Sequence, residues 1–180
     1  MDEALQLVIA MSERHWKRFM DELTDVTPEE SHWRPLPQAN NMHVILQHLW
    51  IEEQLYVASL EHGEQSPYQD PASLQQLTES VPREFARTLE ELEELHNRFI
   101  AVLRSTTLAD VKQQAVLSWA FGDRAPLPAE IRQHWTAALL FREIQHLTIH
   151  EGQLRTLRNL YRKTRGEPAL FFPDNPTFPA

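Results

Sequence analysis

The segment HLTIHEGQL, residues 146–154, places His146 and His150 four residues apart. In a helix, residues at this spacing lie on one face, with Cβ atoms about 5–6 Å apart. Two imidazoles so placed can bind one metal ion, at metal–nitrogen distances of about 2.0–2.1 Å for zinc. The spacing therefore indicates a two-histidine clamp. The same pattern is also compatible with two histidines that pack in the core and bind no metal.

A third ligand has to come from another helix, and His48 is the strongest candidate. It lies in VILQHLWIEEQ, in the middle of an expected helix and among apolar residues. Three neutral histidines leave at least one coordination position open, which is typical of a reactive rather than a structural site. We therefore predict a metal site at His48, His146 and His150. The competing interpretation makes His48 a core histidine that is satisfied by a hydrogen bond.

Two carboxylates are placed to assist this site. Glu143 precedes His146 by three residues and Glu52 follows His48 by four, so each shares a helix face with a predicted ligand. Either could be a ligand, orient an imidazole or act as a general base, and a surface ion pair is the alternative for each. We expect three aromatic residues to recognise the shape of a substrate: Trp33, Trp119 and Phe121.

A di-iron carboxylate centre is a more distant alternative. Such bundles use a Glu-x-x-His motif on two helices and a glutamate from each of the other two. The segments Glu93–His96 and Glu143–His146 match that motif. They fall on the third and fourth expected helices rather than on the second and fourth, and they leave His48 and His150 without a role. A mononuclear site accounts for more of the histidines.

Apolar residues at helical spacing predict four long helices that position these side chains. The expected helices cover residues 2–23, 41–62, 82–104 and 128–165, with short helices after Thr27 and after Asp70. Connections of very different length join them, which favours an all-α four-helix bundle. A short strand or hairpin is allowed around Gly122, between the third and fourth helices. The predicted core comprises Leu5, Ile9, Phe19, Ile45, Leu49, Phe85, Leu92, Phe99, Leu139 and Leu154.

The length of 180 residues suits one domain. We assign residues 1–165 to the bundle and residues 166–180 to a tail, rich in proline and phenylalanine, that packs on the body or on a partner. An arginine stripe near the end of the fourth helix is expected to be a solvated face; it comprises Arg155, Arg158, Arg162 and Arg165. The other histidines without a convergent partner are expected to be structural or solvated: His15, His32, His43, His62 and His134.

Composition limits the classes of function. The net charge of −9 argues against non-specific nucleic-acid binding, which needs a basic surface. The chain has no cysteine, so histidine, carboxylate or backbone oxygen must hold any metal, and a reactive thiol must come from a ligand. The apolar run at residues 7–11 is too short for a signal core or a membrane span. We therefore expect a cytoplasmic protein that acts on a small-molecule substrate, with no nucleic acid and no membrane as partner.

Two segments, TPEESHWRPLPQANNMHVILQHLWIEEQ and HLTIHEGQLRTLR, resemble the signatures of the DinB-like (DinB/YfiT) family. The resemblance covers residues 5 to about 163. It implies a four-helix bundle that holds a divalent metal such as zinc, nickel or iron through three histidines, which fall on His48, His146 and His150. Family members with known activity include metal-dependent transferases and isomerases that use a low-molecular-weight thiol such as bacillithiol, mycothiol or glutathione. Homodimers are common among them.

The chain departs from the family pattern at Glu151, where a basic residue often follows the last histidine. This departure leaves the substrate class open. The resemblance and the histidines together suggest a metal-dependent enzyme, a thiol-dependent S-transferase or isomerase. The alternative is a metal-binding or stress-response bundle protein without turnover.

Overall fold

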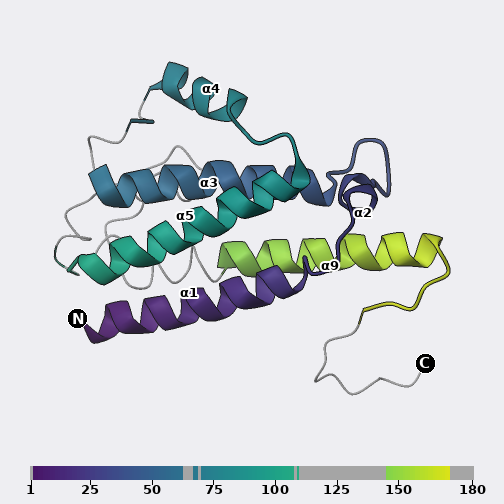
Figure 1. The fold of residues 1–180 in the computed structure, drawn as a ribbon, viewed down its shortest axis with the longest axis horizontal. Helices are drawn as coiled ribbons and strands as arrows, with labels where there is room; N and C mark the ends of the chain where they lie inside the picture. Colours follow the sequence, from purple (N-terminus) through teal and green to yellow (C-terminus); the bar gives the residue numbers. More distant parts are fainter. Residues whose placement is uncertain (1, 63–66, 69, 108, 110–144, 171–180) are drawn as a thin grey trace.

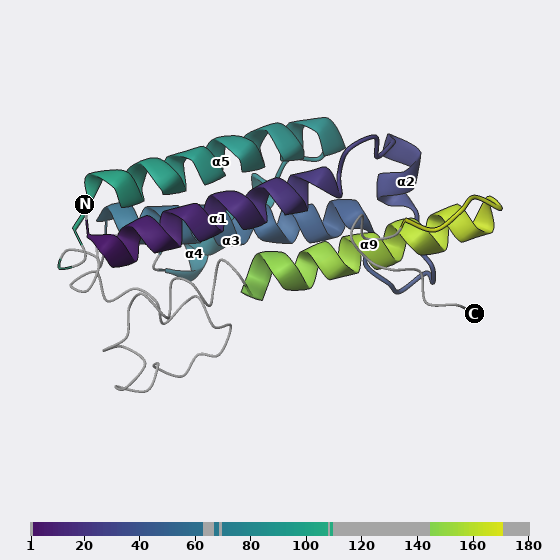
Figure 2. The same ribbon diagram turned by 90° about the horizontal axis from the view of Figure 1, so that it is seen from below.

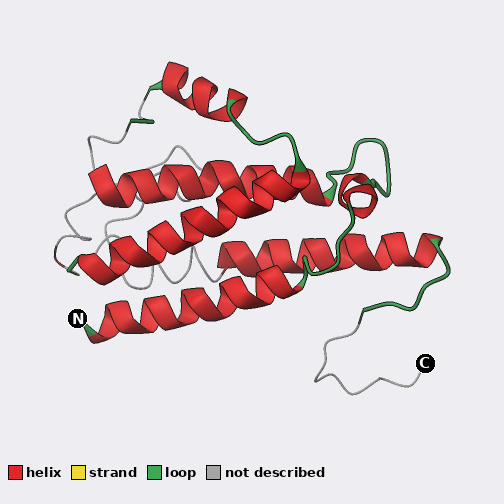
Figure 3. Ribbon diagram, in the orientation of Figure 1, coloured by secondary structure: helices red, strands yellow, loops and turns green. Residues whose placement is uncertain are grey.

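The computed structural model describes residues 2–62, 67–68, 70–107, 109 and 145–170. These residues contain the helices α1 (Glu3–Asp21), α2 (Pro28–His32), α3 (Met42–His62), α4 (Pro71–Glu79), α5 (Phe85–Ser105) and α9 (Leu147–Thr164) (Figure 1). The described part contains no strand (Figure 3), so the predicted all-α class is confirmed. The strand or hairpin allowed near Gly122 lies outside the described residues.

Four long helices form the body of the molecule. Figures 1 and 2 show α1, α3, α5 and α9 side by side, with α1 and α9 running opposite to α3 and α5. In this arrangement α5 lies between α1 and α3, and α9 contacts both α1 and α3. The short α2 covers one end, and α4 stands outside the group on the side of α3. Within the described residues, no helix is long and apolar enough to cross a membrane.

Capping side chains mark the start of three helices. Asp2 accepts a hydrogen bond from the backbone N–H of Ala4 at 2.8 Å and begins α1. Thr27 accepts one from the N–H of Glu30 at 3.1 Å, and Pro28 follows it as the first residue of α2. At α4, the side chain of Asp70 caps two backbone N–H groups in the same way.

Two apolar clusters make up the core. One joins the first half of α1 to the last halves of α3 and α5. The other joins the end of α1 to the first halves of α3 and α5 and to α9. Leu139 of the predicted core lies outside the described residues. The other predicted core residues are all buried: Leu5, Ile9, Phe19, Ile45, Leu49, Phe85, Leu92, Phe99 and Leu154.

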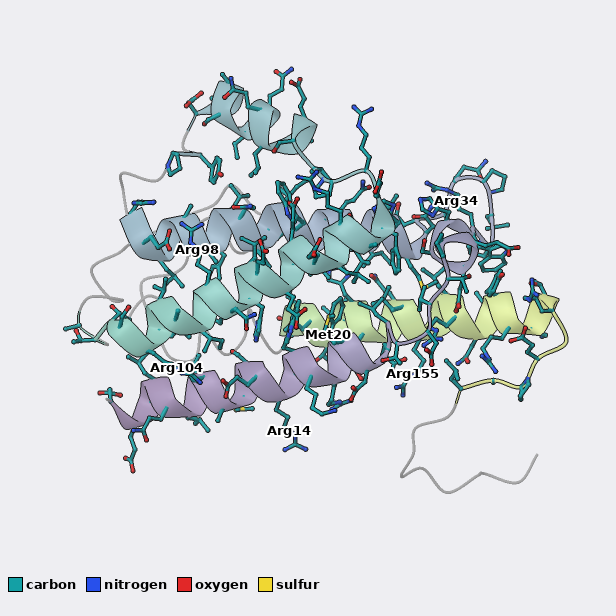
Figure 4. All side chains as sticks on the ribbon, in the orientation of Figure 1. Arg14, Met20, Arg34, Arg98, Arg104 and Arg155 are labelled. Carbon is teal, nitrogen blue, oxygen red and sulfur yellow. The ribbon has the colours of Figure 1, made fainter. Side chains whose placement is uncertain are left out.

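Two arginines of the predicted solvated stripe are not solvated: Arg158 is buried and Arg155 is half-buried. The side chain of Arg158 is 8% exposed; its Nε donates to Glu30 Oε1 at 3.0 Å and its Nη1 donates to the backbone oxygen of Glu22 at 2.7 Å. Arg155, labelled in Figure 4 near the end of α1, pairs with the carboxylate of Glu22. The prediction was wrong for these two residues because α1 and α2 cover this face of α9 and bring acidic partners to it.

Charged pairs at the surface join further helices. Arg98 and Arg104, both labelled in Figure 4, extend from α5. Arg98 pairs with Glu61 of α3, and Arg104 donates to Glu13 of α1 at 2.7 Å. Exposed pairs of this kind contribute about 0–1 kcal/mol each. They therefore add little to the stability that comes from the core.

The segment after α9 turns back along the helix. Gly166 has a φ of 72°, and the N–H of Glu167 donates to the carbonyl of Arg162, which closes the helix in a Schellman turn. The side chain of Asn159 then exchanges two hydrogen bonds with the backbone of Leu170, at 2.7 and 3.4 Å. Residues 166–170 thus lie against α9, and the rest of the predicted tail is outside the described residues.

Candidate metal centre

Three imidazoles meet between α3 and the start of α9. The Nε2 atom of His146 lies 3.3 Å from Nε2 of His48 and 3.1 Å from Nε2 of His150. One ring nitrogen from each of the three lies within 4.8 Å of the others. The structure therefore brings together the three histidines that the sequence singled out, although they stand up to 102 residues apart.

The backbone at the start of α9 contributes to this arrangement. Gln145 and His146 lie in a π-helical turn directly before Leu147, the first α-helical residue. Such turns are rare and occur frequently at functional sites. His150 follows one turn later, and its ring centroid is 4.6 Å from that of His146. Since α9 contacts α3, the ring of His48 reaches both, at centroid distances of 5.4 and 5.2 Å.

The spacing of the nitrogens fits a divalent cation. Two nitrogens that are each about 2.05 Å from zinc at a tetrahedral angle stand about 3.3 Å apart, and at a right angle about 2.9 Å apart. The separations of 3.1 and 3.3 Å at His146 fall in this range. Imidazole nitrogen is a common ligand for zinc, copper, iron and nickel. The donor set and its geometry are therefore suited to a transition metal ion.

Gln153 orients the most deeply placed of the three rings. Its Oε1 lies 2.8 Å from Nδ1 of His150. An amide oxygen can only accept, so Nδ1 of His150 carries the proton and donates. Its Nε2, which faces the other two histidines, then keeps a free lone pair. Gln153 was not among the site residues predicted from the sequence, although its position three residues after His150 puts both on one helix face.

Burial differs among the three histidines. His150 is buried, His146 is half-buried and His48 is exposed. Burial lowers the pKa of His150, and the nearby His48 lowers it further, while the hydrogen bond to Gln153 acts in the opposite direction. His150 therefore stays neutral to lower pH than an ordinary histidine, which suits a metal ligand. The exposed His48 leaves one side of the cluster open to solvent.

The remaining predicted site residues do not all lie near the three histidines. Glu52 is half-buried on α3, one turn after His48. Trp33 packs edge-on against Tyr161 with ring centroids 5.8 Å apart. Tyr161 is about 16 Å along the helix from His150, at 1.5 Å per residue, so Trp33 is not brought to the three histidines. The other predicted residues, Glu143, Trp119 and Phe121, lie outside the described residues.

His96, which the di-iron alternative needs, lies in a different environment. Its ring stacks on Trp16 with centroids 4.4 Å apart and planes 8° apart. Burial lowers its pKa to about 4. In the described part of the chain, the group of His48, His146 and His150 is the only set of three or more potential ligands that converge, and His96 is not in it.

Glu151 points to α1 rather than serving the histidine cluster. Arg18 Nη2 donates to its Oε1 at 2.8 Å. The carboxylate is buried, and its Oε2 has no hydrogen-bond partner among the described residues. Glu151, the acidic residue after the last histidine, therefore pairs with a basic residue of a neighbouring helix, Arg18 of α1.

Comparison with family models identifies the family of this chain. A family model described as the DinB superfamily matches residues 11–154. Comparisons with curated proteins and with solved structures gave no match. The matched range contains all three histidines and more than half of the chain. This helical protein with a three-histidine cluster belongs to the DinB superfamily.

Proposed function

We propose that this protein is a metal-dependent enzyme that transfers a low-molecular-weight thiol to an electrophilic small molecule or uses the thiol to isomerise it. In this proposal His48, His146 and His150 hold one divalent cation. The observation that carries it is the approach of Nε2 of His146 to the same atoms of His48 and His150, at 3.3 and 3.1 Å. The exposure of His48 supports access for a substrate.

The charge of the ligands favours an anionic co-substrate. When bound, a divalent cation supplies Lewis acidity that stabilises a thiolate at neutral pH. Three neutral imidazoles contribute no negative charge, so they leave the positive charge at the site uncompensated. A thiol fits this requirement because it becomes an anion on losing its proton. The chain itself has no cysteine, so the thiol has to arrive as a co-substrate.

Glu52 is the proposed proton acceptor. It is half-buried and lies one helical turn after His48, on the same face of α3. General base catalysis by a positioned carboxylate contributes about 10²–10⁴-fold in rate. We expect Glu52→Gln to lower turnover by a factor in this range and to leave metal content unchanged. Glu143 is a second candidate for this role. Trp119 and Phe121 remain the predicted substrate-recognition residues, whereas Trp33 packs against Tyr161, away from the three histidines.

Turnover tests this proposal most simply. The chain, purified without nickel affinity chromatography and loaded with zinc, nickel or iron, is assayed with bacillithiol, mycothiol or glutathione against a panel of electrophiles. We expect thiol consumption by the wild type that is lost in His48→Ala. His62→Ala is the matched control, because His62 is an exposed histidine at the far end of α3. Bound metal without turnover of any pair would favour the alternative, a metal-binding protein without catalysis.

A further inference from the structure

Gln153 contacts the cluster from outside the set of ligands. Its amide oxygen lies 2.8 Å from Nδ1 of His150, and Nε2 of the same ring lies 3.1 Å from Nε2 of His146. A neutral imidazole carries its single N–H on one nitrogen only. The position of that proton decides whether Nε2 can bind a metal ion, because a protonated nitrogen has no lone pair to donate.

We infer that Gln153 is a positioning residue of the metal centre, which holds His150 in the tautomer with the proton on Nδ1. This inference rests on the proposed metal site. Without an acceptor at Nδ1, both tautomers of His150 become accessible, and the ring loses the contact that sets its rotation. In the alternative tautomer the Nε2–H points at His146 and His48 and blocks the ligand position.

The size of the effect follows from exposure. Partners that orient a ligating histidine affect metal affinity by about 10–100-fold. Gln153 is exposed, so water can replace part of its hydrogen bond in a variant, and the loss falls at the lower end, about tenfold. An exposed side chain on the surface of α9 contributes little to the core, so the stability of the metal-free chain should not change.

Three variants separate the acceptor from the bulk of the side chain. Gln153→Leu removes the acceptor. Gln153→Glu keeps an acceptor at the same reach and should bind metal at least as tightly as the wild type. Gln6→Leu makes the matched change at an exposed glutamine of α1 and should have no effect.

The first readout is the affinity of the full-length chain for Co²⁺ and Zn²⁺, measured by optical titration and by competition with a chelator. We expect about tenfold weaker binding in Gln153→Leu, with wild-type affinity in Gln6→Leu and recovery in Gln153→Glu. Equal affinity of the wild type and Gln153→Leu would overturn the role of Gln153 and leave the proposed function standing.

The second readout needs no metal. The ring-nitrogen chemical shifts of His150 in the metal-free chain report its tautomer. They should show the proton on Nδ1 in the wild type and in Gln153→Glu, and a mixture of tautomers in Gln153→Leu. If the wild type binds neither metal, the proposed function fails. The tautomer of His150 still decides the role of Gln153, because an unchanged tautomer in Gln153→Leu would contradict it.

Discussion

Arg158 of α9 and Glu30 of α2 form a buried ion pair, with Nε donating to Oε1 at 3.0 Å. Both side chains are 8% exposed. The same guanidinium donates to the carbonyl of Glu22, so one side chain joins α9 to α2 and to the end of α1. This contact fixes α9, which contains His150 and directly follows His146, against the first half of the chain.

Removing one partner of this pair should be costly. A buried ion pair that loses one partner leaves an uncompensated charge, which costs about 3–5 kcal/mol. We therefore expect Arg158→Ala to lower the free energy of unfolding by about that amount, measured by urea denaturation. Arg87→Ala is the control, since Arg87 pairs with Glu91 at 2.7 Å on the surface and should cost less than about 1 kcal/mol. Similar losses in the two variants would show that the buried pair has no special weight.

Stability should fall in acid because of His96. Its pKa is about 4 in the folded chain, well below the ordinary value of 6.5, since burial disfavours the charged ring. The unfolded chain therefore binds more protons between pH 6.5 and 4, and stability is lost as the pH falls through this window. Across this whole pH window, the free energy of unfolding falls by about 3 kcal/mol. We expect urea denaturation at pH 7.5 and pH 4.5 to show it.

A variant isolates this contribution from other groups. His96→Phe keeps an aromatic ring against Trp16 and removes the titrating group. Burial also lowers the pKa of His43 and His150, so a part of the acid destabilisation should persist in the variant. The pH dependence of the wild type should exceed that of His96→Phe. Curves with the same slope would mean that the folded chain accommodates a charged His96.

Binding of metal should depend on pH through proton competition. Imidazole ligands have to be neutral, so protons displace the metal as the pH falls through about 6.5, the ordinary value for histidine. Equilibrium dialysis with zinc from pH 8 to pH 5 measures the bound fraction. We expect a steep decrease below pH 6.5. A bound fraction that stays constant to pH 5 would indicate carboxylate ligands and would revive the di-iron alternative.

Local patterns were sufficient to predict the long helices within the described residues and the histidine cluster; residues 128–144 of the predicted fourth helix lie outside the described residues. The helical repeat of apolar residues and the capping residues Asp2 and Thr27 depend on near neighbours in sequence. The pairing of His146 with His150 depends on a spacing of four residues within one helix. His48 could be added because a polar residue stood in the middle of an apolar helical segment.

These local patterns could not predict contacts between segments that are distant in the sequence. His32 and His43, for which no convergent partner was identified, lie 3.1 Å apart between Nε2 and Nδ1, and Nε2 of His43 lies 3.0 Å from Thr88 Oγ1. The burial of Arg158 against Glu30 likewise requires knowing which helix covers which face. The π-helical turn at His146 has no counterpart in propensity or periodicity that a single sequence displays.

Metal content tests the central claim, the three-histidine metal site, most directly. It is measured on the chain purified without added metal and without a nickel-affinity step, and again after loading with zinc. We expect about one equivalent of metal per chain after loading. His150→Ala should lose most of it, while the metal-free forms of the two proteins keep similar unfolding free energies, because the buried apolar clusters supply the stability. His62→Ala should bind like the wild type. Equal metal content in the wild type and His150→Ala would contradict the three-histidine site. A large core truncation costs about 2–5 kcal/mol. If the metal-free His150→Ala variant were destabilised by that amount, His150 would be a core residue instead.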